Sequence, residues 1–434
     1  MTGFDQLTHA VRTDVGVRRS HNQDAFAADP AGDPDRFTAH GHLFLVADGM
    51  GGHAVGEKAS AKAVRDIPHT YHKHAPEGAA AALKKAFTEA NAGIHAIGQE
   101  NPEFRGLGTT ATALLLRPEG AWVGHVGDSR AYRIRDGVIE QLTFDHSAVW
   151  EIARRQRVNP EELQGIRSNV ILRSLGPDAF VEVDVEGPHP IRPGDIYLVC
   201  SDGLTGQLSD HEIGAVASAL PPAEACEFLV ELANLRGGPD NTTVVIVQVG
   251  GTDDPAAADP ATPRPKRRRT VPWPLTTLAL GIGLAVLALV LVTAGVPGGR
   301  EAFVLAIAAI GAGLFGLGLH GPRDAAPAEA EPAPPQLRIY RSAQCRIERP
   351  LLDKLVKAEA ALAQRLTDMA TDNGGREYQE HRTGAEKALA QGDLVTAFRE
   401  HCRAMHVLLK TFNSQRHKEE VFQPVWDKHE GSES

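Results

Sequence analysis

The sequence predicts an α+β protein in which antiparallel sheets are covered by helices. Short runs of apolar residues recur over the first 250 residues, and helical stretches lie between them in separate blocks. Asp136-Gly137, between two alternating runs, is a strong signal for a tight β-hairpin. Neighbouring strands joined by tight turns favour antiparallel pairing over repeated βαβ units.

The strands are the clearest elements of this first region. Helical patterns are expected near 56–74, 79–99 and 209–235, and Ser209 with Glu212 forms a capping box at the start of the last of these. The expected strands are Leu43–Ala47, Thr110–Leu116, Trp122–Val126, Ala131–Arg135, Val138–Leu142, Ile196–Cys200 and Thr242–Val249.

Composition divides the chain into segments of different character. A mixed, strand-rich region is followed by a Pro/Ala linker that ends in a basic cluster, two apolar runs, a second Pro/Ala linker and a charged helical region. These segments are 1–250, 251–271, 272–296, 302–320, 321–335 and 336–434.

The two apolar runs predict a transmembrane hairpin. Each run reaches about 18 uncharged residues, the length needed to span a bilayer, and the turn Pro-Gly-Gly-Arg-Glu at 297–301 separates them. Basic residues at 264–269 and Arg323 flank the pair, so the positive-inside rule places both ends in the cytoplasm. A helical hairpin buried in a soluble domain is the alternative, but such a hairpin normally has a polar face.

The C-terminal region predicts a small bundle of three helices. Leucines recur at helical spacing from Leu352 to Leu366, and Asn373-Gly374-Gly375 ends that pattern. A second helix is expected to end near Gln391, and a third carries Leu394 and Phe398 on one face. These apolar stripes are typical of a helical core, with partner docking or dimerisation as the functional alternative.

Composition and charge exclude several classes of protein. The net charge of −10 argues against a nucleic-acid binder. The four cysteines show neither a C-x-x-C pair nor a C-x5-R loop, so zinc knuckles, redox dithiols and thiolate phosphatases are excluded and a reducing compartment fits. The first 20 residues contain no apolar run of the kind found in a signal peptide.

Five aspartates indicate a candidate cation site, because each lies next to a glycine or at the edge of an apolar strand. An Asp-Gly pair alone is an ordinary turn, but carboxylates at converging strand ends repel one another unless a cation neutralises them. Oxygen-only ligation selects Mg²⁺ or Mn²⁺, and glycines let backbone carbonyls approach such ions. The five are Asp24, Asp48, Asp128, Asp202 and Asp240.

Over residues 8–250 the sequence resembles the bacterial metal-dependent serine/threonine protein phosphatases of type 2C. The resemblance implies a four-layer αββα sandwich, that is, two antiparallel sheets flanked by helices. Seven motifs occur in the family's order: Arg19–Asp24, Asp48–Glu57, Gly108–Thr112, the GDSRAY segment around Asp128, Leu142–Ser147, the SDGL segment with Asp202, and the GGPDNTT segment with Asp240 and Asn241.

Carried over by position, the resemblance implies a role for each matching residue. Asp48 would bridge two metal ions, with the Gly49 carbonyl on one of them and Asp202 and Asp240 on the other, and Asp128 would hold a third ion. Arg19 would bind the substrate phosphate, as a planar guanidinium does well. The resemblance places Gln23, Asp24 and Asn241 around the metal ligands, with Asp24 hydrogen-bonded to metal-bound water.

Two positions depart from the family pattern. Gln23 stands where many members have glutamate, so the metal affinity is expected to be lower. Met50 stands where animal members have a histidine proposed as the general acid, and bacterial relatives commonly carry methionine there. The nearby His53 fits a structural or exposed residue better than that catalytic role.

The resemblance implies hydrolysis of phosphoserine and phosphothreonine in proteins by a hydroxide that bridges two Mn²⁺ or Mg²⁺ ions. The expected partners are phosphorylated proteins, among them bacterial Ser/Thr kinases and their substrates. The expected location is the bacterial inner membrane, with the phosphatase and C-terminal regions both cytoplasmic. The alternatives are a dedicated anti-anti-sigma-factor phosphatase and a catalytically dead membrane adaptor, which would require missing metal carboxylates.

Overall fold

A computed structural model of the protein describes residues 7–51, 56–100, 102–104, 106–163, 165, 170–250, 339–369 and 375–422, with scattered positions between 282 and 308. Contacts divide the chain into two compact units. One unit comprises residues 1–258 together with 335–434, and the other comprises residues 259–334.

Two antiparallel sheets form the centre of the first unit, as the sequence predicted. One sheet has the order β1 (Leu7–Asp14), β11 (Thr242–Val249), β10 (Ile196–Cys200), β7 (Arg130–Arg135), β8 (Val138–Gln141) and β12 (Arg341–Gln344). The other has the order β2 (Asp24–Asp29), β3 (His42–Met50), β5 (Ala111–Arg117), β6 (Gly120–Val126) and β9 (Asp184–His189), with β4 (Gly108–Thr109) paired to β3.

Alternation along the strands separates three apolar cores, because successive side chains of a strand point to opposite faces. On β11, Val245 and Val247 point into the core between the sheets, where they join Phe44 of β3. Val244 and Ile246 point to the other face of β11 and belong to a different core. Burial of both faces explains why such a strand is a nearly continuous apolar run in the sequence.

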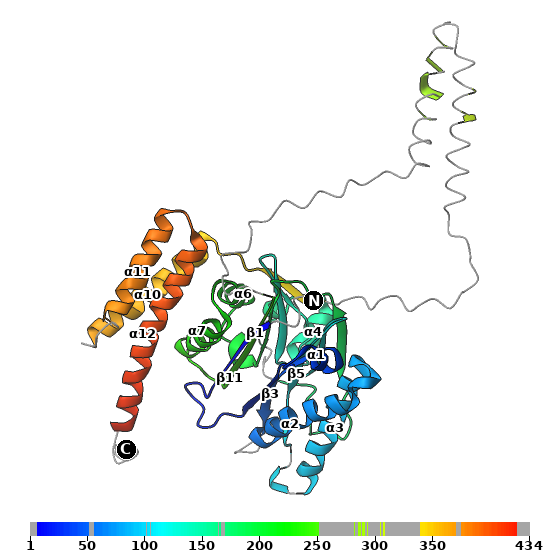
Figure 1. Ribbon diagram of the computed structural model, residues 1–434, viewed down its shortest axis with the longest axis horizontal. Helices are drawn as coiled ribbons and strands as arrows, with labels where there is room; N and C mark the ends of the chain where they lie inside the picture. The colour runs from blue at the N-terminus through cyan, green and yellow to red at the C-terminus, as the bar shows by residue number, and fades with distance from the viewer. Residues whose placement is uncertain are drawn as a thin grey trace. The chain divides into compact units, whose positions relative to one another are not determined.

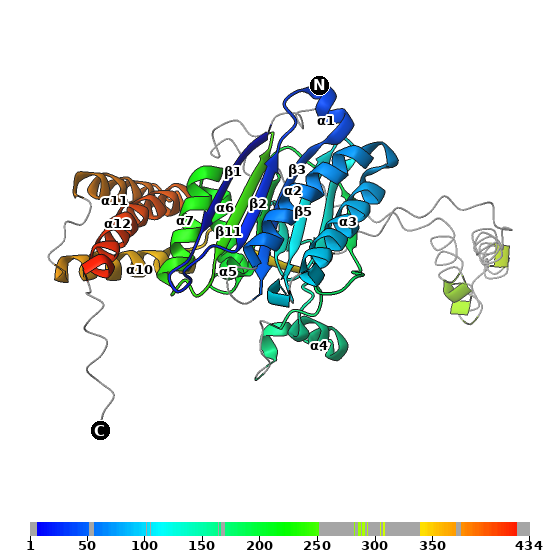
Figure 2. The ribbon, with the colours of Figure 1, turned by 90° about the horizontal axis from the view of Figure 1, so that it is seen from below.

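Helices cover the outer face of each sheet (Figures 1 and 2). Helices α2 (Gly56–His74) and α3 (Ala79–Glu100) pack on β3 and β5. Helices α6 (Asp210–Ala219) and α7 (Pro222–Leu235) pack on β10 and β11. The remaining helices of this region are short: α1 (Pro34–His40), α4 (Ala148–Gln156) and α5 (Asp202–Thr205), with 3₁₀ turns at Ala75–Glu77, Pro102–Phe104 and Pro160–Glu162.

The single helical stretch predicted at 209–235 is two helices in the structure. Leu220 ends α6 in an extended conformation, and Pro221 caps the start of α7. Two consecutive prolines cannot continue a helix, because each lacks an N–H donor and disfavours the helical conformation of the residue before it. The predicted capping box is confirmed, since Ser209 and Glu212 exchange both hydrogen bonds.

The C-terminal region contains the three predicted helices and one strand that the sequence did not predict. The helices are α10 (Arg349–Asp368), α11 (Gly375–Ala390) and α12 (Leu394–Phe422). Strand β12 pairs antiparallel with β8, with Arg341 opposite Gln141. One apolar core runs without interruption from β10 and β11 through α6 and α7 into α10–α12, so these helices pack against the first 250 residues as an additional layer (Figure 1).

Charged contacts hold α12 along α7. The Arg403 guanidinium binds the Glu224 carboxylate, with Nε 2.8 Å from Oε2. The His406 Nδ1 lies 2.7 Å from Glu231 Oε2, and the hydrogen bond to Glu231 raises the pKa of His406 above its usual value. Basic groups on α12 therefore face glutamates on α7 beside the apolar core that the two helices share.

The predicted membrane spans, 272–296 and 302–320, lie outside the described residues apart from scattered positions. Within the part of the chain that the structure describes, no helix is both long and apolar enough to cross a bilayer. The basic cluster and the two linkers, 251–271 and 321–335, also lie outside the described residues.

Candidate metal centre

Two of the five aspartates lie opposite each other on neighbouring strands. Asp24 begins β2, Asp48 lies near the end of β3, and the two residues are direct partners in the antiparallel pairing. Directly opposed residues have Cβ atoms about 5 Å apart. The structure therefore places two carboxylates side by side at the same end of this sheet.

The other three aspartates come from connections that follow or precede buried strands. Asp128 lies in the connection after β6, Asp202 is the first residue of α5 after β10, and Asp240 precedes β11. The charges of all three act on the carboxyl group of Asp48, together with that of Asp24. The convergence predicted from the strand ends is therefore present in the structure.

Burial and mutual repulsion raise the carboxyl pKa values of Asp24, Asp48, Asp128 and Asp202. Burial raises the pKa of Asp24 to about 7, and nearby acidic charges add to the effect. Burial and the charge of Asp240 raise the pKa of Asp202 to about 6. The pKa values of Asp48 and Asp128 lie well above the usual range for the same two reasons. Ionised, this group of side chains requires positive charge nearby.

Hydrogen bonds satisfy only part of the cluster. The hydroxyls of Ser201 and Thr243 both donate to Asp24 Oδ2, each at 2.7 Å. Within the described residues, buried oxygens without a protein partner remain on Asp24, Asp128 and Asp202, in each case Oδ1. Buried acceptors of this kind are costly unless a ligand satisfies them.

Sequence reasoning did not single out Ser201 and Thr243. Ser201 precedes Asp202 and also accepts a hydrogen bond from the Thr243 backbone N–H at 2.9 Å, which joins β10 to β11 beside the cluster. Both residues lie within quoted motifs, SDGL and GGPDNTT. Their positions in those motifs could have flagged them, but only the strand pairing shows that both reach Asp24.

The backbone around Gly49 is tightly packed against two other segments. A Cβ atom on Gly49 would lie 2.3 Å from the carbonyl oxygen of Gly56 and 2.6 Å from that of Gln23. The neighbouring Asp48 is held by its N–H, which donates to Thr110 Oγ1 at 2.9 Å. This position accepts only glycine, and the close approach fixes the end of strand β3 that carries Asp48.

Arg19 lies at the rim of the cluster. Its side chain is 48% exposed, and Nη2 is 2.7 Å from Asp240 Oδ2. The segment between Arg19 and Asp24 is tied to the loop before β11, because the Gln23 N–H donates to Asn241 Oδ1 at 2.8 Å. Met50 ends β3 and is partly buried, while His53 lies outside the described residues.

The residues of the cluster fit a centre for hard divalent cations. Its candidate ligands are carboxylate and carbonyl oxygens. In the part of the chain that the structure describes, buried carboxylate oxygens of Asp24, Asp128 and Asp202 have no protein partner, and burial and mutual repulsion raise the pKa values of these groups. Mg²⁺ and Mn²⁺ prefer such oxygen ligands, whereas zinc and copper favour nitrogen or sulfur. The individual role of each predicted ligand stays a prediction.

A family model described as protein phosphatase 2C matches residues 17–227. The chain is 35% identical over 245 residues to the serine/threonine protein phosphatase PstP of Mycobacterium tuberculosis, a match that covers 56% of this chain and 45% of that one. The chain therefore spans about half the length of that relative. The match to the serine/threonine phosphatase stp of Listeria monocytogenes is 34% identical over 243 residues, covering 55% of this chain and 94% of that one.

One solved phosphatase structure is similar to this chain in both sequence and fold. The Streptococcus agalactiae serine/threonine phosphatase is 33% identical to this chain, with a TM-score of 0.50. The match covers 56% of this chain and all of that one. The similarity to these relatives therefore covers little more than half of this chain.

Proposed function

Because the chain belongs to the protein phosphatase 2C family, we propose that it hydrolyses phosphoserine and phosphothreonine in proteins. The observation that carries this proposal is the convergence of Asp24, Asp48, Asp128, Asp202 and Asp240, with buried carboxylate oxygens that have no protein partner in the described residues. The alternative of an inactive adaptor requires missing carboxylates, and all five are present.

We assign the cation ligands as Asp48, the Gly49 carbonyl, Asp202 and Asp240, with Asp128 at a third position. Bound Mn²⁺ or Mg²⁺ would lower the pKa of water and offset the charge that develops on the phosphoryl oxygens. Asp24, held by Ser201 and Thr243, offers its free Oδ1 as a hydrogen-bond acceptor beside that centre.

The exposed Arg19 is suited to bind the substrate phosphate. Its guanidinium already lies 2.7 Å from Asp240, so its position is set relative to the cluster. Guanidinium groups bind phosphate oxygens in pairs, which adds orientation to charge neutralisation. The oxygens of the transferred group would then be held between Arg19 and the cations. The substrates that we propose are phosphorylated Ser/Thr kinases and their targets.

Phosphate release from a phosphothreonine peptide tests this function. With Mn²⁺ we expect turnover by the full chain, and with excess EDTA we expect a loss of at least a thousandfold, because metal ions contribute several kcal/mol of charge stabilisation. Restoring Mn²⁺ should restore the rate. Turnover that is unchanged in EDTA, or no turnover with either Mn²⁺ or Mg²⁺, would reject the proposal.

We also propose that residues 272–296 and 302–320 anchor the protein in the bacterial inner membrane, with the phosphatase and C-terminal regions cytoplasmic. The support is the length of the two uncharged runs and the flanking basic residues. In fractionated cells, the full chain should sediment with membranes and be released by detergent but not by high salt. A variant lacking 272–320 should remain in the supernatant. Release of the full chain by salt alone would contradict the anchor.

A further inference from the structure

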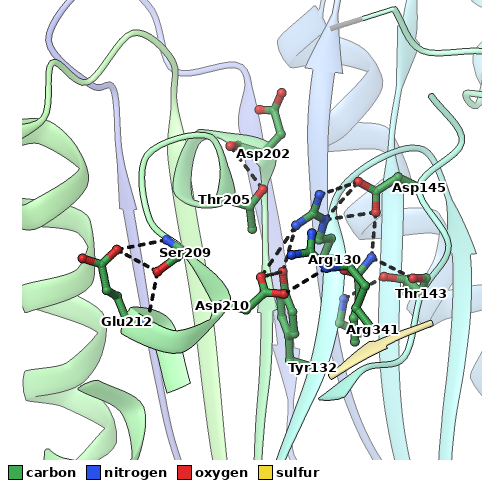
Figure 3. A network of polar contacts seen from close by, with 12 residues as sticks. Arg130, Tyr132, Thr143, Asp145, Asp202, Thr205, Ser209, Asp210, Glu212 and Arg341 are labelled. Atoms are coloured by element: carbon green, nitrogen blue, oxygen red, sulfur yellow. Dashed lines mark hydrogen bonds and ion pairs between the residues drawn. The ribbon is translucent and has the colours of Figure 1, made fainter. Parts of the chain in front are cut away.

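A cavity of about 440 Å³ lies next to the carboxylate cluster. Its walls come from strand β7, helix α4 and the segment after it, the connection between α5 and α6, and the C-terminal strand β12. Figure 3 shows the polar side of this region, where Arg130, Asp210 and Arg341 gather below Thr205.

One wall of the cavity lies one helical turn from Asp202. Gly206, which lines it, donates its N–H to the Asp202 carbonyl at 2.7 Å. Arg130 on another wall lies two residues after Asp128. Four helical residues advance about 6 Å along the axis, a length that about two residues of an extended peptide span. A peptide with its phosphorylated residue at the cluster could therefore place a side chain two positions away in this cavity.

One side of the cavity is apolar. Val149 and Trp150 of α4, Pro160 and Leu163 of the following segment, and Leu208 line it. Complete burial of an apolar side chain contributes roughly 1.5–3 kcal/mol, and contact with this one wall supplies part of that free energy. The cavity is large enough for a leucine or phenylalanine side chain, and this wall offers such a side chain apolar contacts.

The charged groups on the other side neutralise one another. Arg130 Nη2 lies 2.7 Å from Asp145 Oδ2, and Arg341 Nε lies 3.5 Å from Asp210 Oδ2. Asp210 Oδ1 also accepts a hydrogen bond from the Tyr132 hydroxyl at 2.9 Å. Two guanidinium groups thus face two carboxylates, and the balance leaves no net charge to attract a charged substrate residue.

Arg341 comes from outside the residues matched by the phosphatase family model, which end at 227. Pairing of β12 with β8 sets its position, with Arg341 opposite Gln141 and the Tyr340 N–H donating to the Gln141 carbonyl at 3.0 Å. The Arg341 side chain is 27% exposed. The C-terminal segment therefore completes a wall that the matched region alone does not supply.

We propose that this cavity is a specificity subsite that takes an apolar side chain two residues from the phosphorylated residue of the substrate, with Arg341 of the C-terminal strand as one of its walls. The inference rests on the proposed phosphatase function and adds a preference among phosphoproteins. In this proposal the C-terminal strand β12 contributes to substrate specificity through Arg341.

The test compares phosphothreonine peptides that differ at a single position, two residues before or two residues after the phosphothreonine. The full chain with Mn²⁺ is expected to show a kcat/KM about tenfold or more higher for leucine than for alanine at one of these positions, the range typical of an apolar pocket. Glutamate there should give no gain over alanine. Equal rates for leucine and alanine, or a preference for glutamate, would overturn the inference while leaving the phosphatase function standing.

Variants of the cavity wall locate the source of the preference. For each variant we take the ratio of kcat/KM for the leucine peptide to kcat/KM for the alanine peptide, so that a general loss of activity cancels. Leu163→Ser should bring the ratio to within twofold of one, and Arg341→Ala should lower it threefold or more. Arg349→Ala, on the exposed start of α10 and outside the cavity, should keep the wild-type ratio.

Unchanged ratios in both Leu163→Ser and Arg341→Ala would overturn the assignment of the preference to this cavity. No hydrolysis of any of the peptides by the wild-type chain with Mn²⁺ would instead reject the proposed function, and the subsite with it. The two failures are therefore distinguishable.

Discussion

Replacing Asp48 with asparagine is expected to lower kcat/KM for a phosphothreonine peptide by about a thousandfold or more. Asp48 lies opposite Asp24 in the strand pairing, and four carboxylates act on it. Asparagine keeps the shape of the side chain but removes the negative charge that we propose as a cation ligand. Loss of several kcal/mol of charge stabilisation corresponds to a loss of this size.

Stability measurements separate a damaged site from a damaged fold. In EDTA no cation offsets the acidic charges of the cluster, and burial together with the neighbouring acidic charges raises the pKa values of Asp24 and Asp48. A carboxyl pKa raised by folding means that stability is present at low pH and is lost as the pH rises. Removing the Asp48 charge relieves this repulsion, so D48N should unfold in EDTA at the same temperature as the wild type or at a higher one.

Asp66→Asn is the matched control. Asp66 lies on α2 and pairs with Lys62 on the same helix, away from the cluster. Phosphate release and Mn²⁺ titration calorimetry should show wild-type behaviour for D66N, and loss of both turnover and tight Mn²⁺ binding for D48N. Retention of more than a tenth of the wild-type kcat/KM in D48N would contradict the proposal that Asp48 is a cation ligand.

Replacing Glu359 with alanine is expected to lower the free energy of unfolding by about 2–5 kcal/mol, because each buried polar group left without a hydrogen-bond partner costs about 1–3 kcal/mol. Glu359 is 3% exposed between the C-terminal helices. Its Oε1 accepts a hydrogen bond from the Tyr378 hydroxyl at 3.1 Å, and its Oε2 lies 2.6 Å from His401 Nδ1. The substitution leaves both partners buried without an acceptor and opens space in the core.

Urea denaturation of the full chain, followed by circular dichroism, measures this loss. Glu386→Ala is the control, because Glu386 is 66% exposed and its contact with Arg382 is a surface pair of the kind that contributes about 0–1 kcal/mol. The apolar core is continuous between the bundle and the α6–α7 layer, so we expect E359A to shift one common transition. A separate early transition of the bundle, or a loss below 1 kcal/mol, would contradict this view.

Local sequence was enough to predict most of the central strands and several turns. Asp136 and Gly137 both adopt positive φ, 54° and 75°, as the hairpin turn inferred from their sequence requires. The expected strands at 43–47 and 242–249 lie within β3 and β11, because both faces of each are buried and their sequences are almost wholly apolar. The helix break at Pro221 could also have been read from the sequence.

Two strands could not be predicted from their local sequence. Strand β12, Arg-Ser-Ala-Gln, carries no apolar alternation, and its extended conformation comes from pairing with the free edge of β8. Strand β1 has a mixed sequence in which exposed and half-buried residues alternate irregularly. Such segments become strands only because a neighbouring strand supplies hydrogen-bond partners.

The candidate site divides in the same way. Aspartates beside glycines at strand ends can be recognised along the chain, and from them both the cation centre and the family resemblance were inferred. The hydrogen-bond partners of these aspartates cannot be recognised along the chain. Ser201 and Thr243 reach Asp24 only through the pairing of β10 with β11 and the stacking of the two sheets.

By itself the sequence determined the antiparallel strands, the acidic cluster, the three C-terminal helices and the apolar runs at 272–296 and 302–320, because periodicity, turn chemistry and motif spacing are local properties. Only the tertiary structure decided that the C-terminal helices share a core with the first 250 residues and that Arg341 reaches the cavity beside Asp202. Those contacts join residues far apart in the chain, and their geometry follows from sheet pairing and core packing, which no local pattern encodes.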